Sequence, residues 1–168
     1  MNTISISPSQ PEDAEGIAAV QYNTWLATYP NEDAGVSLSA IKERISSFQS
    51  AERVAKWRTI ISAVEENLIV AKVGKEVIGF SGAREGKETN EITTLYVLPE
   101  YHGRGVAQSL MDAALTCLGD NRDVVVEVAS YNLRAINFYQ KYDFIRTGEI
   151  GQSGVIPTIR LRLKAKQT

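Results

Sequence analysis

Two glycines, Gly103 and Gly105, stand between a stretch with strand character and a stretch with helix character. Residues 91–97 are rich in β-branched and aromatic side chains, which favours a strand, and Pro99 lacks the backbone N–H that would continue it. From Val106 onward, apolar residues recur at helical spacing. A helix that begins behind small residues presents free N–H groups and about half a positive charge. The pattern therefore predicts a main-chain site for a phosphate or pyrophosphate.

Two well-known phosphate-binding loops can be compared with this turn. The P-loop requires a Lys-Ser/Thr pair after its last glycine, but Gly105 is followed by Val106 and Ala107. The dinucleotide-binding fingerprint requires a third glycine where Gln108 stands, and residues 98–102 form a long gap for its tight strand-to-helix turn. A nucleotide-dependent enzyme is therefore a rival interpretation that fits the sequence poorly.

Further polar side chains stand beside stretches expected to be core. Glu127 follows the apolar run 124–126, which we expect to be a strand buried on both faces, where a charge is costly unless it is paired or functional. Glu91 begins the strand before the glycine loop. For each carboxylate, the alternative is a strand-end group that faces solvent or pairs with an arginine. Asn132 and Tyr139 are seven residues apart, so they share one face of a short helix.

The glycine loop resembles the acetyl-CoA loop of the GNAT superfamily of N-acetyltransferases, whose motif is Gln/Arg-x-x-Gly-x-Gly/Ala. Here the motif reads His102-Gly103-Arg104-Gly105-Val106-Ala107. The histidine replaces the usual Gln or Arg, which we expect to matter little because the cradle is mostly backbone. A second stretch, residues 127–144, is similar to the family's fifth strand and fourth helix. Its matching residues are Asn132, Ala135, Phe138, Tyr139 and Phe144, while Asp143 stands where Gly is usual.

The resemblance implies acetyl-CoA as the cosubstrate. The backbone N–H groups that would hold its pyrophosphate are those of Gly103, Arg104, Gly105, Val106, Ala107 and Gln108. The resemblance also implies strand-like pairing of the pantetheine arm with the main chain of Leu95, Tyr96 and Val97, where the family's strand bulges, and a contact from Asn132 on the other side. No metal is expected, since one Cys and one His do not make a Cys/His metal site.

Acetyl transfer from a thioester to an amine needs two proton steps. A positioned acid can protonate the departing thiolate, and Tyr139 is our candidate because it fits both the motif and the helix spacing. Its alternative is a core aromatic packed beside Phe138. The amine must lose a proton before it attacks, since most aliphatic amines are protonated at neutral pH. Glu127 and Glu91 fall where different GNAT enzymes carry their base, and the sequence does not choose between them.

The resemblance places the acceptor pocket in the front part of the chain. Trp25 and Tyr29 are our candidates for acceptor binding, and Tyr29 is the better placed because Pro30 follows it at a helix end. We expect core positions for Trp57, which has helical spacing, and for Cys117, on the apolar stripe after the loop. The acceptor is expected to be a primary amine of a small molecule or a protein.

The elements that position these residues follow a mixed α/β order. Strands are expected at residues 3–7, 68–73, 76–82, 91–97, 124–126, 144–149 and 155–163. Helical stripes are expected along residues 14–25, 38–48, 54–64, 106–118 and 133–142. A capping box at residues 9–12 is expected to start the first helix, and Ser37 and Asn132 are expected to cap later ones. We expect one domain over residues 1–168. The order is similar to the GNAT arrangement, and this resemblance implies a mostly antiparallel sheet that splays between its fourth and fifth strands and is flanked by helices.

Composition narrows the class of protein. Of 168 residues, 43% are hydrophobic and 23% charged, which is ordinary for one soluble globular domain. The formal net charge of −2 argues against nucleic acid as the main partner. No apolar run approaches the ~20 residues of a membrane span, and the first residues lack the pattern of a secretory signal. We therefore expect a cytoplasmic protein with no membrane partner.

Two points about assembly and activity complete the hypothesis. GNAT proteins are often dimers, and we expect the edge of the strand at residues 159–163 to be able to pair with a second copy. The rival outside enzymes is a GNAT-fold module that binds CoA, or nothing, and acts as a sensor or scaffold. The glycine loop and Tyr139 favour an N-acetyltransferase that passes acetyl directly from acetyl-CoA to the amine.

Overall fold

Seven strands form one sheet among the described residues, 3–63 and 66–166, of the computed structural model. The strands lie in the order β1-β2-β3-β4-β5-β7-β6, and all neighbours are antiparallel except β4 and β5. Their bounds are β1 (Ile4–Pro8), β2 (Asn67–Val73), β3 (Glu76–Arg84), β4 (Asn90–Val97), β5 (Val124–Ala129), β6 (Ile145–Ser153) and β7 (Ile156–Leu163). The mixed α/β class and the mostly antiparallel sheet predicted from the sequence are confirmed.

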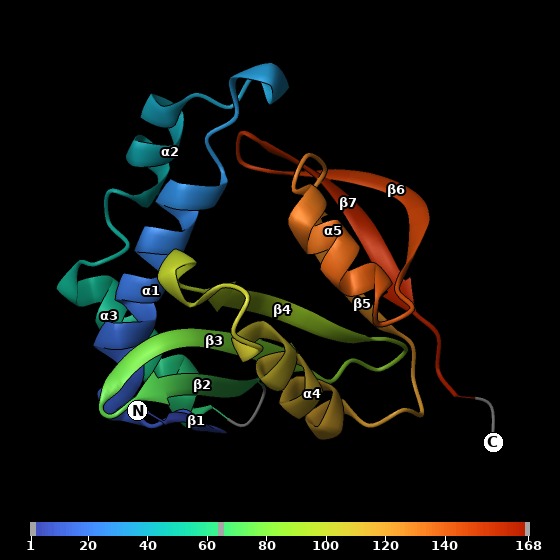
Figure 1. Cartoon of the computed structure of the whole chain (residues 1–168), viewed down its shortest axis with the longest axis horizontal. Coiled ribbons are helices and arrows are strands. Elements are labelled where there is room, and N and C mark those ends of the chain that lie inside the picture. The colour runs from blue at the N-terminus through green and yellow to red at the C-terminus, as the bar shows by residue number, and fades with distance from the viewer. Residues whose placement is uncertain (1–2, 64–65, 167–168) are drawn as a thin grey trace.

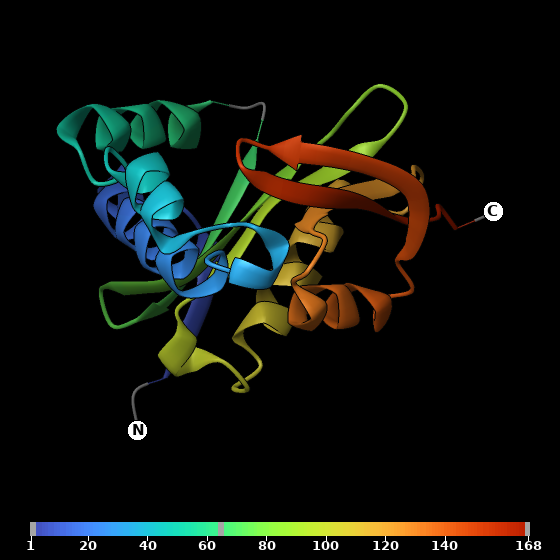
Figure 2. The ribbon, with the colours of Figure 1, turned by 90° about the horizontal axis from the view of Figure 1, so that it is seen from above.

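Helices cover both faces of this sheet. They are α1 (Ala14–Thr28), α2 (Leu38–Ile45), α3 (Ala51–Ser62), α4 (Val106–Leu118) and α5 (Leu133–Gln140). Figures 1 and 2 show α1 and α3 on one face of the β1–β4 half and α4 on the other, with α5 beside α4. The inner strand β3, between β2 and β4, is consequently buried from Val77 to Ala83. Leu110, Met111 and Ala114 of α4 pack fully buried in this main core.

The parallel pairing of β4 with β5 is short. The paired residues are Asn90 with Val124, Glu91 with Val125 and Ile92 with Val126. Asn90 fixes this end, because its fully buried side-chain amide donates a hydrogen bond of 3.0 Å to the Leu118 carbonyl at the end of α4. Beyond Ile92 the two strands separate, which confirms the predicted splay.

A bulge in β4 marks the point of separation. Gly82 of β3 pairs with Thr94, whereas the next pair skips Thr93 to reach Ile92. The bulge therefore lies ahead of the segment 95–97 in which we expected it. A Cβ at Gly82 would come within 2.8 Å of the Thr94 hydroxyl oxygen, so this position has no room for a side chain.

A second, smaller core packs the end of α1 and residues 36–48, which we call the α2 segment, against the end of β5 and the start of β7. These segments lie close together in Figure 2. Its buried members are Trp25, Val36, Ile41, Ile45, Phe48, Ala129 and Ile156. The partly buried Tyr96 ring packs against both the main core and this second core.

Several expectations about helices need correction. The first helix begins after a turn at Pro11–Asp13, where the Asp13 carboxylate accepts from the Gln10 N–H at 2.8 Å, one residue later than the predicted capping box. Leu38 is 44% exposed, because it stands at the start of α2 before that helix reaches the core. Cys117 is exposed, since the buried stripe of α4 passes through its neighbour Leu118. Val64, which we placed on the third helical stripe, lies outside the described residues.

Expectations about strands need correction too. The strand at 124–126 is not buried on both faces, because Val125 is half-buried and Glu127 is exposed on a face that no helix covers. The strand at residues 159–163 is not an edge, since β7 lies between β5 and β6. The edge is β6, so the predicted pairing of a second copy with residues 159–163 is wrong.

Asp143 generates a stability prediction. It lies at φ 65° in the turn that follows the end of α5 at Gln140, where the Phe144 N–H donates to the Tyr139 carbonyl at 3.2 Å in the pattern of a Schellman cap. Asp143→Gly should stabilise the fold by roughly 0.5–1 kcal/mol in urea denaturation, because glycine adopts a left-handed conformation without steric cost. Asp143→Ala is the matched control and should destabilise it. A less stable glycine variant would show that contacts of the Asp143 side chain outweigh the backbone cost.

Candidate active site

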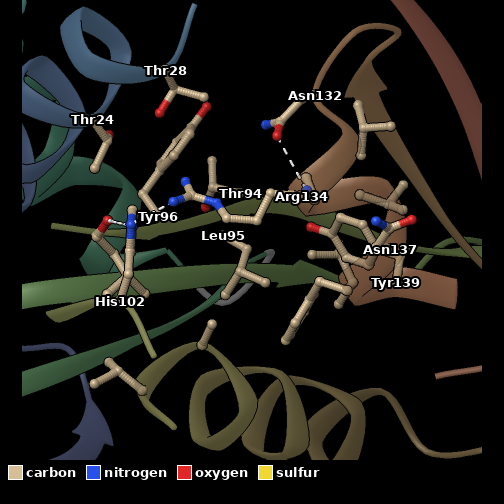
Figure 3. Close-up of a pocket in the computed structure, with 18 of the residues that line it drawn as sticks. Thr24, Thr28, Thr94, Leu95, Tyr96, His102, Asn132, Arg134, Asn137 and Tyr139 are labelled. Carbon is tan, nitrogen blue, oxygen red and sulfur yellow. Dashed lines mark hydrogen bonds between the residues drawn. The ribbon is translucent and has the colours of Figure 1, made fainter. Parts of the chain in front are cut away.

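A cavity of about 560 Å³ opens where β4 and β5 diverge. Its walls are the outer edge of β4, the end of β5, the loop before α4, one face of α5 and the end of α1. Figure 3 shows side chains from these elements converging on it. The predicted residues that line it are Tyr29, Leu95, Tyr96, Val97, Gly103, Gly105, Val106, Ala107, Gln108, Glu127, Asn132 and Tyr139.

The glycine loop has the geometry of an anion cradle. Gly103 and Gly105 lie at φ 74° and 77°, which favours glycine at both positions on conformational grounds. Gly105 is the residue before the first turn of α4. Within the described ranges, no backbone hydrogen bond uses the N–H groups of residues 103–108. The Arg104 side chain does not line the cavity and instead lies over the Tyr101 ring, 5.4 Å from its centroid.

The outer edge of β4 forms the floor of the cavity. Beyond Ile92 it has no partner strand on the β5 side. The backbone groups of Leu95 and Val97 point to that side, because the register with β3 turns those of Thr94 and Tyr96 toward β3. One group of this edge is already engaged, because the His102 ring donates from Nε2 to the Val97 carbonyl at 2.8 Å. The position that we expected to matter little therefore ties the loop to the strand.

Asn132 and Tyr139 face the cavity from the α5 side. The Asn132 side-chain oxygen caps α5 by accepting from the Ala135 N–H at 3.1 Å, which leaves its NH₂ group toward the cavity in Figure 3. The buried Tyr139 ring packs edge-on against Phe138 and Phe144 at centroid distances of 5.4 and 5.5 Å. Figure 3 shows its hydroxyl pointing from α5 toward β4. Burial raises the pKa of Tyr139 well above its ordinary value, so this hydroxyl stays protonated at neutral pH.

The two candidate carboxylates are both paired with arginines. Glu127 accepts from Arg160 at 3.0 Å, and Glu91 accepts from Arg84 at 2.5 Å. The alternative given for each carboxylate, pairing with an arginine, therefore describes both. They differ in position, because Glu127 lines the cavity and Glu91 does not.

The two residues predicted to bind the acceptor also differ in whether they line the cavity. Tyr29 lines the cavity, and the pKa of its hydroxyl is raised well above the ordinary value by burial and by the neighbouring Tyr96. Trp25 does not line it: the ring is buried in the second core, and its Nε1 donates to the Tyr96 hydroxyl at 3.1 Å. Helical spacing turns Trp25 toward the second core, so its part in acceptor binding stays a prediction that its position does not support. Trp57 is in the main core as predicted, edge-on to Phe80.

Comparison with known proteins agrees with this geometry. Residues 28–144 match the Acetyltransferase (GNAT) family, a span that includes the glycine loop and most of the cavity wall and exceeds half of the chain. The chain belongs to the GNAT acetyltransferase family. Members of this family are acyltransferases, which confirms the enzyme class predicted from the two motifs.

Individual GNAT relatives extend the comparison. An Archaeoglobus fulgidus protein named an uncharacterized N-acetyltransferase is 36% identical over 108 residues, 59% of this chain and 71% of the relative. A GCN5-related N-acetyltransferase from Rhodopseudomonas palustris is similar in structure, with a TM-score of 0.72 at 22% identity over 99% of this chain and 98% of that one. The PaiA N-acetyltransferase of Thermoplasma acidophilum, solved with coenzyme A, has a TM-score of 0.68 at 20% identity over 98% and 99%. These structures confirm the GNAT fold.

Cavity residues that sequence reasoning missed include polar side chains of α1, of β4 (Thr93 and Thr94) and of α5 with the turn after it. Thr24 and Thr28 are one turn apart on α1 and line the cavity. Their spacing in the sequence, a polar stripe that leads to Tyr29, could have indicated them. Arg134, Asn137 and Lys141 follow the cavity face at and just beyond α5. Their helical spacing shows that they share one face of α5, but polar residues at this spacing are equally typical of a helix face exposed to solvent.

No helix within residues 3–63 and 66–166 is long and apolar enough to cross a membrane. No group of three or more His, Cys, Asp or Glu side chains in those ranges is arranged to hold a metal ion.

Proposed function

We propose that this GNAT protein transfers an acetyl group from acetyl-CoA directly to a primary amine of a small molecule or a protein. The observation that carries the proposal is a meeting of three features in one cavity. They are the open edge of β4, the left-handed glycine loop before α4 and the Tyr139 hydroxyl. The coenzyme A held by the PaiA N-acetyltransferase of similar fold supports the same cosubstrate here. Acetyl-CoA would supply the acetyl thioester.

The residues present fit the polar parts of that cosubstrate. Free N–H groups of residues 103–108 at the start of α4 suit a pyrophosphate. The unpaired β4 edge at Leu95, whose backbone groups point away from β3, suits an arm that contains amides, as pantetheine does, because such an arm can complete the strand's hydrogen bonds. Asn132 offers an amide group from the opposite wall.

Tyr139 is the proposed proton donor to the departing thiolate. Its hydroxyl points into the cavity, and its raised pKa keeps the proton in place at neutral pH. Glu127 is the proposed acceptor of the amine's proton, since it is the candidate carboxylate that lines the cavity. The ion pair with Arg160 fixes the position of that carboxylate. Tyr29, with Thr24 and Thr28, would contact the amine substrate.

The remaining expectations stand as part of the proposal. We infer one domain over residues 1–168, located in the cytoplasm. A homodimer stays a prediction, and its contact would have to use an edge other than β7. The alternative function is a CoA-binding sensor or scaffold without turnover. That alternative leaves the direction of the Tyr139 hydroxyl without a purpose.

Titration calorimetry tests the cosubstrate. Acetyl-CoA should bind with a micromolar Kd, because the cavity offers main-chain contacts along both the loop and β4. NADH and ATP are the controls and should bind at least about tenfold more weakly. Absence of acetyl-CoA binding to folded protein would remove the proposed function. Binding without thiol release on any amine in a broad screen would favour the sensor.

Tyr139→Phe tests the acid. Turnover should fall roughly a hundredfold or more, while the Kd of acetyl-CoA changes little, because the variant removes a proton donor and keeps the packed ring. Thiol release under saturating acetyl-CoA measures the first quantity and calorimetry the second. Tyr22→Phe, which removes a tyrosine hydroxyl outside the cavity, should retain turnover. Unchanged turnover in the Tyr139 variant would assign that residue to packing alone.

Glu127→Gln tests the base. We expect kcat/KM for the amine to fall roughly a hundredfold at neutral pH, as loss of a general base does. Glu149→Gln is the matched control, because Glu149 also pairs with Arg160, at 3.6 Å, but does not line the cavity. Equal losses in both variants would mean that the ion-pair cluster matters for structure only. A larger loss in Glu91→Gln would transfer the role to that residue.

A further inference from the structure

Arg134 and His102 face each other across the cavity. Arg134 lies on α5 and His102 on the loop that leads into α4, and both line the cavity. Arg134 Nη1 lies 2.5 Å from His102 Nδ1. Figure 3 shows the guanidinium reaching from α5 over β4 toward the imidazole. The contact therefore joins the two walls between which the cosubstrate is proposed to bind.

The hydrogen bond of the other ring nitrogen, Nε2, determines which group donates in the contact between Arg134 and His102. The Val97 carbonyl oxygen can only accept, so His102 Nε2, 2.8 Å away, must carry the hydrogen. Nδ1 then has a free lone pair, which accepts from the Arg134 guanidinium. Burial and the adjacent Arg134 charge lower the pKa of His102, which agrees with a neutral imidazole.

Arg134 differs from the arginines that hold strands together. Arg84 and Arg160 pair with glutamates, whereas no carboxylate within the described part of the chain lies at ion-pair distance from Arg134. Arg104, on the loop itself, lies over the Tyr101 ring and away from the cavity. Arg134 is thus an uncompensated cation aimed across the loop, and its forked guanidinium matches phosphate geometry.

We propose that Arg134 binds a phosphate group of CoA, and that His102 holds the guanidinium over the loop before the cosubstrate arrives. The inference rests on the proposed function. A phosphate replaces the imidazole as partner, because a charge-assisted, bidentate contact is stronger than one bond to a neutral nitrogen. Main-chain N–H groups of residues 103–108 act from one wall and Arg134 from the other.

Titration calorimetry of Arg134→Gln with CoA tests the first half. Its Kd should rise roughly tenfold to a hundredfold, as expected for loss of hydrogen bonds to a charged group. Arg146→Gln is the matched control, since it removes the same charge from an exposed position on β6, outside the cavity, and should leave the Kd within about twofold. Arg134→Lys should lose less than Arg134→Gln. Thermal unfolding of each variant confirms that it is folded.

Two additional measurements separate a phosphate contact from a packing effect. The wild-type Kd should weaken more steeply between about 50 and 200 mM salt than that of Arg134→Gln, because an ionic contact is screened. Titration with 3′-dephospho-CoA identifies the phosphate: a variant effect that persists assigns the pyrophosphate, and one that vanishes assigns the 3′-phosphate. A loss with unchanged salt dependence would overturn the proposal in favour of packing.

His102 variants test the second half. His102→Ala should weaken CoA binding, but by less than Arg134→Gln, and should add nothing in the Arg134→Gln background. His102→Gln should retain wild-type affinity, since a glutamine amide has both the donor for Val97 and an acceptor for Arg134. Additive losses would mean that His102 acts on the loop independently of Arg134.

The outcomes separate this inference from the proposed function. If the wild-type protein does not bind CoA, the proposed function fails and this inference with it. If the wild type binds CoA and Arg134→Gln matches Arg146→Gln, only the role of Arg134 is overturned.

Discussion

The site depends on how briefly β4 and β5 pair. Asn90 holds the two strands together at one end, because its buried amide bonds to the Leu118 carbonyl and its backbone N–H donates to the Asp123 carbonyl at 2.8 Å. Immediately beyond, the bulge at Thr93 turns β4 away from β5. A longer ladder would close the gap, and a shorter one would leave the C-terminal strands without an anchor. The short pairing of β4 with β5 and the bulge at Thr93 therefore open the cavity, and the side chains then line it.

An open strand edge in the middle of a sheet carries unpaired backbone groups, and such groups stabilise the fold only when something bonds to them. Here the protein engages the Val97 carbonyl through His102 and leaves the neighbouring positions to a ligand. The left-handed glycines then bring the start of α4 to the same place. Local backbone conformations thus prepare both the strand-like contacts and the anion contacts, while side chains such as Tyr139 add the chemistry.

The sequence predicted what local patterns encode. The element order, the glycine loop and the shared helix face of Asn132 and Tyr139 follow from spacing and turn residues within a few positions, whereas the splay was implied by the resemblance to the GNAT family. The burial expected for the Glu127 strand face was wrong, because burial depends on which helices cover a strand, and Glu127 is exposed. Cys117 was misjudged by one position on a helix whose stripe passes through Leu118. The meeting of Arg134 with His102, 32 residues apart in the chain, has no local signal at all.

The two cores of the molecule meet at one ring, because Tyr96 packs against both. On one side of Tyr96 lie the loop and helices that face the proposed cosubstrate. On the other side, the α2 segment, residues 36–48, packs against the start of β7. Trp25 of the second core donates to the Tyr96 hydroxyl, and Tyr96 also lines the cavity, so a substitution around Trp25 reaches the cavity wall through this ring. Tyr96 is therefore constrained from both directions.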